Sequence, residues 1–367
     1  MSLPLVRPPH TGISRRAGVL LVTVIVLVAV IALLNIVNVP RVIYRPGPTY
    51  DTLGEVDGTP VIEVDGLETY PTSGSLDFTT ITLSGGPRFP VSAWDWIQAR
   101  FDSSTTIVDE QEVFPEDVTP AEVREQNLEL MTDSQQQAAV VALRAIDEDV
   151  PEDVVVAQVL VDAPADGVLS VNDRIMRVKD TDIGNPDDLR AILQEVAAGE
   201  EVDFEIEREG EALTISVPTT EQVDTDAQGN ETSRTIIGIY PVSDFDVPYD
   251  IVINAGNVGG PSAGLMFTLA VYDVITPGEL TGGLDFAGTG TMSSEGDVGP
   301  IGGIRQKMIA AQRAGADYFL APARNCDEVV GQIPDGLKVA KVATFDEARD
   351  VVEAVGADPE AAVAQCE

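Results

Sequence analysis

Histidine and lysine are scarce in this sequence of 367 residues, and their scarcity limits the catalytic chemistry of the chain. The single histidine, His10, lies in a basic N-terminal segment, so the folded body cannot hold a Ser-His-Asp or Cys-His site. Histidine-rich zinc sites are excluded for the same reason. If the chain is an enzyme, its proton transfers must use carboxylates, tyrosine, cysteine or lysine. The four lysines are Lys179, Lys307, Lys338 and Lys341.

Positive charge is scarce as well. Lysine and arginine together number 22 against 61 acids, which gives a formal net charge of −39 at pH 7. No acid occurs before Asp51, and five arginines precede it: Arg7, Arg15, Arg16, Arg41 and Arg45. The rest of the chain is therefore even more acidic than the total suggests. Such a body repels phosphate backbones, which argues against a nucleic-acid partner.

One long stretch, residues 17–39, has 23 residues and no charge. As a helix rising about 1.5 Å per residue it would span a hydrocarbon core of about 30 Å. The alternative is a cleaved signal peptide, whose apolar region is usually about 7–15 residues and precedes a small-x-small cleavage site. This run is longer and lacks such a site. The flanking arginines slightly favour a cytoplasmic segment 1–16, a transmembrane helix over 17–39 and a body outside the cytoplasm.

Residues 40–148 mix turn signals with short apolar alternations. Strands are expected at Thr59–Val64 and Leu76–Leu83, and helices at Ala93–Phe101 and Ser134–Ile146, the latter capped by Ser134. Residues 103–130 are acidic and read as loop or short helix.

Residues 149–221 form a compact β-rich unit that resembles a PDZ domain. PDZ domains hold a peptide between a sheet edge and a helix, and the resemblance puts that groove between Val154–Val159 and Leu189–Val196. No Gly-Leu-Gly-Phe-like loop precedes Val154, which leaves recognition of free C-termini open. A purely structural insertion is the alternative. The resemblance rests on Ala163-Pro164-Ala165, Gly167, Leu169, Asn172-Asp173-Arg174-Ile175, Asp188-Leu189 and Arg208-Glu209-Gly210.

The last third of the chain begins with a polar segment, 222–235, that reads as a linker. Residues 236–352 then alternate between strand and helix patterns, as expected of an α/β or α+β domain. Residues 353–367 read as a C-terminal tail.

The stretch Gly259–Gly264, which reads GGPSAG, suggests a site for developing negative charge. Proline suits the first position of a helix, which makes Gly260 the expected N-cap and places Ser262 in the first turn. The amides of Ser262 and Ala263 would then lack intrahelical partners and could stabilise an oxyanion. An ordinary glycine-rich turn explains the same residues.

A serine nucleophile needs a base, and Lys307 is the candidate. It follows the glycine-rich stretch GPIGGIRQK and shares a helix face with Ile304, Ala311 and Ala314. Burial on that apolar face would lower the lysine pKa, and a neutral amine could take the serine proton. A lysine that extends along the surface to solvent is the alternative.

Together these segments resemble the proteolytic domain of Lon proteases. The resemblance makes Ser262 the nucleophile and Lys307 the general base, and assigns Thr289 as the threonine that hydrogen-bonds the lysine. It also implies an α+β fold of the ribosomal protein S5 domain 2-like type and a homo-oligomer. It rests on GGPSAGLMF, GTGTMSSEGDVGPIGGIRQK and AGADYFLAP.

The order of anchor, PDZ unit and Lon-type domain resembles the membrane-anchored PDZ-Lon proteases of Gram-positive bacteria. Residues 40–148 would then be the N-terminal part of the protease body, with the PDZ unit inserted into it. Two features depart from cytosolic Lon proteases. The chain has no Gly-x4-Gly-Lys-[Ser/Thr] phosphate loop, and Gly260 stands where many Lon proteases have an acidic residue.

The two cysteines, Cys326 and Cys366, would lie outside the membrane in this topology. There they could form a disulfide that ties the tail to the domain, worth about 4 kcal/mol by loop closure. Two free thiols are the alternative.

The function expected from the sequence is that of a single-pass membrane serine endopeptidase that needs neither ATP nor a metal or other cofactor. Its substrates would be unfolded or membrane-associated proteins outside the cytoplasm, and the PDZ groove would hold a peptide. One alternative is a non-catalytic PDZ-type adaptor on a protease scaffold. Another is a peptidase that cleaves only its own chain.

Overall fold

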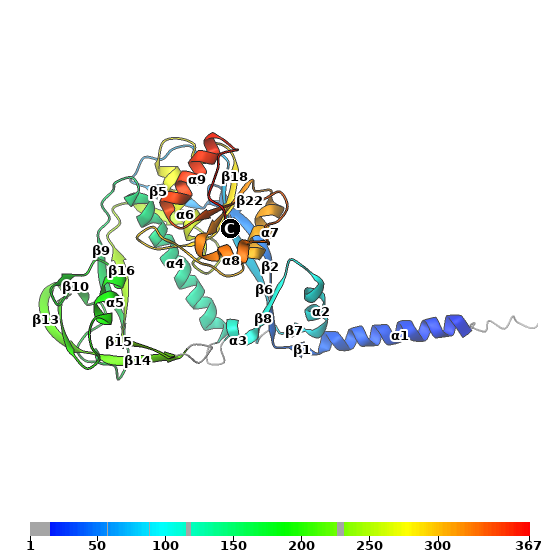
Figure 1. Ribbon diagram of the computed structural model, residues 1–367, viewed down its shortest axis with the longest axis horizontal. Helices are drawn as coiled ribbons and strands as arrows, with labels where there is room; N and C mark the ends of the chain where they lie inside the picture. Colours follow the sequence, from blue (N-terminus) through cyan, green and yellow to red (C-terminus); the bar gives the residue numbers. More distant parts are fainter. Residues whose placement is uncertain (1–14, 57, 88, 115–118, 226–230) are drawn as a thin grey trace, which may run out of the picture. The chain divides into compact units, whose positions relative to one another are not determined.

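The computed structural model describes residues 15–56, 58–87, 89–114, 119–225 and 231–367. The chain divides into two compact units, coloured by sequence in Figure 1. The first unit combines Met1–Ala142 with Ile251–Glu367, and the second is Leu143–Asp250. Both mix helices and sheets, which confirms the α+β prediction.

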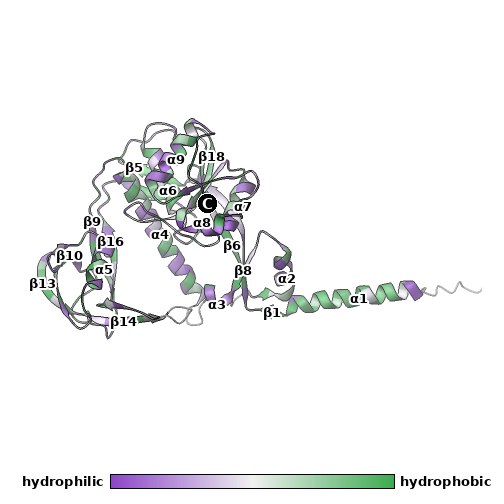
Figure 2. Ribbon diagram, in the orientation of Figure 1, coloured by the Kyte–Doolittle hydropathy of each residue, from purple (hydrophilic) through white to green (hydrophobic). Residues whose placement is uncertain are grey.

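The N-terminal helix α1 (Arg15–Ile36) has 22 residues and is long and apolar enough to cross a membrane. Figure 2 shows its hydrophobic colouring along most of its length. None of its side chains is buried within the protein. The helix ends three residues before the expected boundary at 39, because Asn38–Val39 forms a short strand, β1.

The first unit is built on a six-stranded sheet in the order β22-β21-β18-β6-β2-β8. The four strands from β22 to β6 are parallel, whereas β2 runs antiparallel to both its neighbours. The strands are β2 (Arg41–Asp51), β6 (Ser75–Gly85), β8 (Thr106–Asp109), β18 (Asp285–Gly288), β21 (Tyr318–Pro322) and β22 (Lys338–Val342).

Short strand pairs accompany this sheet. They are β1 with β7 (Val91–Ser92), β3 (Glu55–Val56) with β4 (Thr59–Pro60), β5 (Ile62–Asp65) with β17 (Asp250–Ile253), and β19 (Thr291–Met292) with β20 (Val298–Gly299). The other helices of the unit are α2 (Ala93–Phe101), α3 (Glu110–Val113), α4 (Pro120–Arg144), α6 (Gly264–Ile275), α7 (Ile304–Ala314), η1 (Ala323–Asn325), α8 (Cys326–Val329) and α9 (Phe345–Ala357).

Aromatic and aliphatic side chains fix the helices to the sheet. Phe78 on β6 contacts the rings of Tyr50 and Phe267, at centroid distances of 5.1 and 5.3 Å. Helix α7 buries Ile304 and Met308 in a cluster with Phe319 of β21. This is the apolar face that the sequence periodicity predicts for residues 304–314.

Helix α4 differs most from the sequence expectation in this unit. Its 25 residues begin at Pro120, where the sequence predicted loop or short helix, and Ser134 lies in its interior rather than at its N-cap. The first half of the helix is rich in Glu, Gln and Asn, so its apolar periodicity is weak. The helix is instead held by its buried second half, which includes Met131 and Ala138–Leu143.

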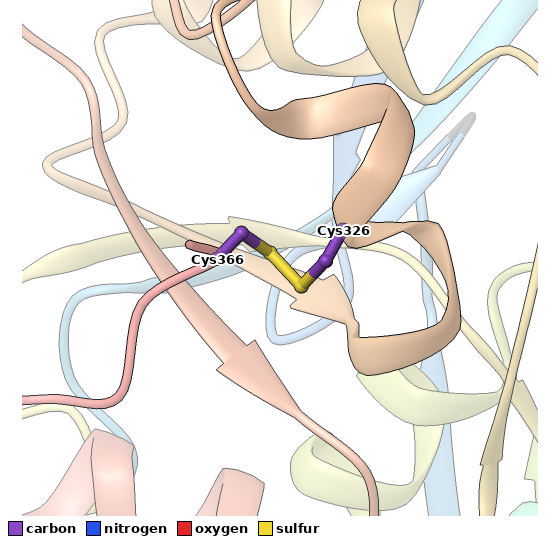
Figure 3. The surroundings of a disulfide bond; sticks show 2 residues. All are labelled: Cys326 and Cys366. Atoms are coloured by element: carbon purple, nitrogen blue, oxygen red, sulfur yellow. A yellow bond between two sulfur atoms is a disulfide. The ribbon is translucent and has the colours of Figure 1, made fainter.

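The C-terminal tail is fastened to the domain. A disulfide joins Cys326 at the start of α8 to Cys366 (Figure 3). Tyr318 donates its hydroxyl hydrogen to the Pro359 carbonyl at 2.7 Å, and the amide of Lys341 donates to the Ala364 carbonyl. Residues 353–357, which the sequence assigned to the tail, complete α9.

The second unit contains a sheet in the order β13-β12-β10-β9-β16 and the helix α5 (Pro186–Gln194). Its core includes Phe204, Ile206, Leu189 and Ile175. The strands are β9 (Glu152–Val159), β10 (Arg174–Val178), β11 (Thr181–Asp182), β12 (Glu201–Arg208), β13 (Glu211–Pro218), β14 (Thr220–Thr225), β15 (Glu231–Ile236) and β16 (Ile239–Phe245), with β11 paired to β10.

The polar segment 222–235 is not a simple linker. Its described residues form the β14–β15 hairpin, in which Thr220 pairs with Ile236; residues 226–230 lie outside the described part. Strand β16 then pairs with β9 along its length, so the unit continues past 221 to residue 250. This pairing joins segments about 85 residues apart, which local sequence patterns cannot reveal.

Candidate active site

Ser262 lies in the turn between β17 and α6, one residue before the helix N-cap. The helix begins at Gly264 with Ala263 as its N-cap, so the prediction of Gly260 as N-cap is wrong. Backbone bonds to the neighbouring 289–290 segment explain the late start. The Ser262 carbonyl accepts from the Gly290 amide at 2.9 Å, and the Leu265 amide donates to the Gly290 carbonyl. These groups are therefore not available for helical bonds.

Gly260 serves a different purpose in this turn. Its φ of +92° lies in the left-handed region that favours glycine. The chain can thereby reverse direction just before Pro261 and present Ser262 at the start of α6. Within the described chain, the amides of Ser262 and Ala263 have no hydrogen-bond acceptor. Such free amides at a helix start can stabilise an oxyanion.

Lys307 meets Ser262 directly. Its Nζ lies 2.7 Å from the serine Oγ and 2.9 Å from Thr289 Oγ1. The lysine is only 3% exposed, and burial lowers its pKa from 10.5 to about 7. The cause is desolvation, which penalises the charged ammonium. Near neutral pH a substantial fraction of this amine is therefore uncharged and able to accept a proton.

Helix α7 delivers the lysine to this position. Gly303, the N-cap, has a φ of +71°, and the helix buries Lys307 on the same side as Met308 and Ile304. On the preceding turn, the side-chain amide of Asn325 brackets Ile301, donating to its carbonyl and accepting from its amide at 2.9 and 3.0 Å. The start of the lysine helix is thus fixed by contacts outside the helix.

Thr289 orients the amine. Its side chain is fully buried just after β18, and its hydroxyl donates to the Ser262 carbonyl at 2.9 Å. A hydroxyl has a single hydrogen, so Thr289 Oγ1 must act as acceptor toward the lysine. One N–H of Lys307 is therefore directed at Thr289, and the amine is turned toward the serine oxygen.

Two residues of α4 that the sequence did not indicate as site residues hold the turn that carries Ser262, residues 259–264. Ser134, 2% exposed, donates its hydroxyl hydrogen to the Pro261 carbonyl at 3.0 Å. The Asn127 carbonyl accepts the Gly260 amide at 2.7 Å. The fit is tight, because a Cβ added to Gly264 would lie 2.7 Å from Ser134 Oγ. The sequence could have indicated these two residues only if it had predicted that α4 begins at Pro120.

The structure thus brings together Ser262, Lys307 and Thr289 and places Gly260 and Ala263 in the same turn. Cys326 and Cys366 are bonded to each other and take no part in the hydrogen-bonded trio. In the described ranges, no group of three or more His, Cys, Asp or Glu is placed to hold a metal ion. The trio is arranged for proton transfer from a hydroxyl to a neighbouring amine.

Comparison with known proteins finds a matching domain family for a segment of each unit. Residues 244–355 match the family model of the Lon protease (S16) C-terminal proteolytic domain. Residues 125–219 match that of the PDZ domain. The chain therefore carries a Lon-type proteolytic domain together with a PDZ domain, as the sequence resemblance implied.

Individual relatives are similar over the proteolytic domain. The Lon protease of Frankia alni is 38% identical over 117 residues, which cover 30% of this chain and 13% of the relative. The Lon protease of Mycoplasma mycoides is 30% identical over 112 residues, which cover 30% of this chain and 14% of the relative. The chain thus spans about a seventh of the length of these relatives.

A crystal structure of the PDZ domain of the SdrC-like protein from Listeria monocytogenes is 21% identical to this chain. The matched region covers 24% of this chain and 86% of the Listeria chain, with a TM-score of 0.20.

The pKa of Lys307 predicts a pH dependence for any reaction that uses it as a base. Below about pH 7 the amine is protonated, so kcat/KM should fall about tenfold per pH unit, and above it kcat/KM should level off. Initial rates on a dye-quenched unfolded protein would give the profile, with circular dichroism as a control for folding. A flat profile through neutral pH would contradict a role for Lys307 as base.

The contact from Ser134 predicts a positioning effect. Ser134→Ala leaves the partly buried Pro261 carbonyl without this donor, and should lower kcat about tenfold with little change in KM. Thr132→Ala is the matched control, because that hydroxyl donates to Leu128 on the exposed side of α4. Equal effects of the two substitutions, or a change confined to KM, would argue against positioning of the nucleophile.

Proposed function

We propose that this protein is an ATP-independent serine endopeptidase with Ser262 as nucleophile and Lys307 as general base. The observation that carries the proposal is the 2.7 Å contact between the serine Oγ and a buried lysine amine whose pKa lies near neutrality. The match to Lon-type proteolytic domains supports peptide bonds as the substrate. The lack of a phosphate-loop motif in the sequence supports independence from ATP.

In the proposed mechanism, the neutral Lys307 amine takes the hydroxyl proton as Ser262 Oγ attacks the scissile carbonyl carbon. The carbonyl oxygen becomes an oxyanion that accepts hydrogen bonds from the Ser262 and Ala263 amides. The Lys307 ammonium then protonates the leaving amine as the C–N bond breaks, which leaves an acyl-enzyme. A water molecule, deprotonated by the same lysine, attacks the carbonyl carbon of this ester. The acyl–Oγ bond then breaks, Ser262 Oγ takes the proton back from the Lys307 ammonium, and the carboxylic acid product leaves. Thr289 keeps the amine aimed at the reacting oxygen throughout.

We further propose that α1 anchors the enzyme in a membrane with residues 1–16 in the cytoplasm and both units outside it. The substrates would then be unfolded or membrane-associated proteins of that compartment. The arginines that precede the span support this orientation, and so does the disulfide, which persists in oxidising surroundings. The resemblance to Lon-type domains supports assembly into a homo-oligomer.

The dyad can be tested with the full chain in detergent. Ser262→Ala and Lys307→Met should each reduce cleavage of a dye-quenched unfolded protein by at least about a thousandfold, because each removes a reacting group. Arg305→Met, which changes an unburied cation on the same helix, is the matched control.

The same assay separates the alternatives. Retained cleavage in either the Ser262→Ala or the Lys307→Met variant would contradict the Ser-Lys mechanism. Peptide binding without turnover in the unmodified chain would favour a non-catalytic adaptor. Cleavage of the enzyme's own chain alone would favour self-processing.

We propose a second function, peptide binding, for a groove in the second unit. A cavity of about 340 Å³ lies between α5 and the segment 236–241. The sequence placed this groove along β9, but both edges of β9 are already paired, to β10 and to β16. β16 ends its sheet and contacts α5, so an added peptide strand could pair with its free edge. Leu189, Leu193 and Ile239 supply an apolar lining.

The loop before β16 favours a free carboxylate as the end of the bound peptide. It reads Ile237-Gly238-Ile239, an apolar-Gly-apolar pattern of the kind that is missing before Val154. Gly238 has a φ of +80°, and a Cβ there would lie 2.2 Å from Ala163 Cβ. The loop is thus held in a glycine-only conformation at one end of the groove.

Binding can be measured by anisotropy of labelled peptides on the full-length Ser262→Ala chain. A peptide with an apolar last residue and a free carboxylate should bind at least about tenfold tighter than its amidated form. Gly238→Ala should abolish this binding, whereas Gly210→Ala should not, because Gly210 has the same left-handed backbone with open space around it. Equal affinity for both peptides would contradict carboxylate recognition.

A further inference from the structure

Helix α2 is attached to the point where α1 ends. The amide of Ala93, the first residue of α2, donates to the Val37 carbonyl at 2.7 Å. Asn38 and Val39 pair with Ser92 and Val91 just before α2. Both helices belong to the first unit and can be followed in Figure 1. The end of α1 and the start of α2 are therefore tied by main-chain hydrogen bonds.

The segment around α2 carries unusually exposed aromatic side chains. Phe101, its last residue, is 87% exposed and Phe89 is 77% exposed. Among the described residues these are the two most exposed aromatic side chains. Leaving such rings in water is unfavourable by roughly 25 cal/mol per Å² of apolar surface. The other side of α2 packs against the protein, where Ala99 and Trp96 contact the cluster that contains Ile43.

The length of α1 locates this surface. A helix of 22 residues is about 33 Å long, close to the thickness of a hydrocarbon core, so a spanning α1 places Val37 at the boundary with water. Ala93, bonded to Val37, lies at the same depth. This is the zone in which aromatic side chains are enriched in membrane proteins.

We propose that α2, together with Phe89 and Phe101, lies in the interfacial layer of the membrane that α1 crosses. The partner is the phospholipid surface itself, bound through apolar burial. Charge contributes little, since the exposed Arg100 is offset by the exposed Asp95 and Asp102. With this second contact the first unit is held on the bilayer at two points instead of pivoting on α1. The inference rests on the proposed membrane anchoring.

The only two tryptophans in the chain, Trp94 and Trp96, both lie on α2 and report its depth. The full-length Ser262→Ala chain would be reconstituted in phosphatidylcholine vesicles with acyl chains brominated either near the headgroup or near the chain end. We expect the shallow bromines to quench tryptophan fluorescence strongly and the deep bromines weakly. A Phe89→Ser/Phe101→Ser double variant should lose at least half of the shallow quenching.

The matched control is Val161→Ser/Val171→Ser, which changes exposed apolar residues of the second unit and should leave quenching unchanged. Flotation of the vesicles after alkaline carbonate extraction reports on α1 separately. Protein that floats but shows no shallow quenching, or quenching unaffected by the double phenylalanine variant, would overturn the proposal for α2 and leave the anchor intact. Protein that does not float would overturn both. Peptidase activity in detergent is independent of either result.

Discussion

The removal of one lysine amine from water is the constraint on which the rest of this site depends. An exposed lysine would hold its proton at neutral pH, and Ser262 would have no base nearby in sequence, since the only histidine, His10, precedes the apolar run of α1. Keeping Lys307 buried requires an apolar helix face, a hydroxyl partner in Thr289 and a closed turn around the serine. The left-handed glycines at 260 and 303 begin the two segments that meet at this amine.

The position of the second unit in the chain has a consequence for this arrangement. The unit is inserted between α4 and β17. These are the two segments next to the turn that carries Ser262: α4 donates a hydrogen bond to it through Ser134 and accepts one through Asn127, and β17 leads into it. The two ends of the inserted unit therefore lead into the two segments that contact or precede the turn at residues 259–264.

The sequence predicted which residues meet at the site better than it predicted the local backbone. Ser262 and Lys307 were recognisable because glycine, proline and helical periodicity are local signals, and the apolar run of α1 is one as well. The N-cap at Gly260 was predicted wrongly because bonds to Gly290, remote in sequence, displaced the helix start. The start of helix α4 was predicted wrongly because tertiary packing of its second half stabilises the helix. Strand β16 was missed because it is stabilised by pairing with β9, which is remote in sequence. For the same reason Ser134 was predicted as an N-cap rather than as a partner of the Ser262 turn, and the expected groove was placed along β9 without knowledge of β16.

The bond between Cys326 and Cys366 closes a 40-residue segment, which restricts the unfolded chain by about 4 kcal/mol. Cys326 directly follows Asn325, the residue that brackets Ile301 at the entrance to the lysine helix. Reducing this bond would release the C-terminal tail from the segment that holds the entrance to α7. The environment in which the chain folds therefore decides whether that covalent link exists.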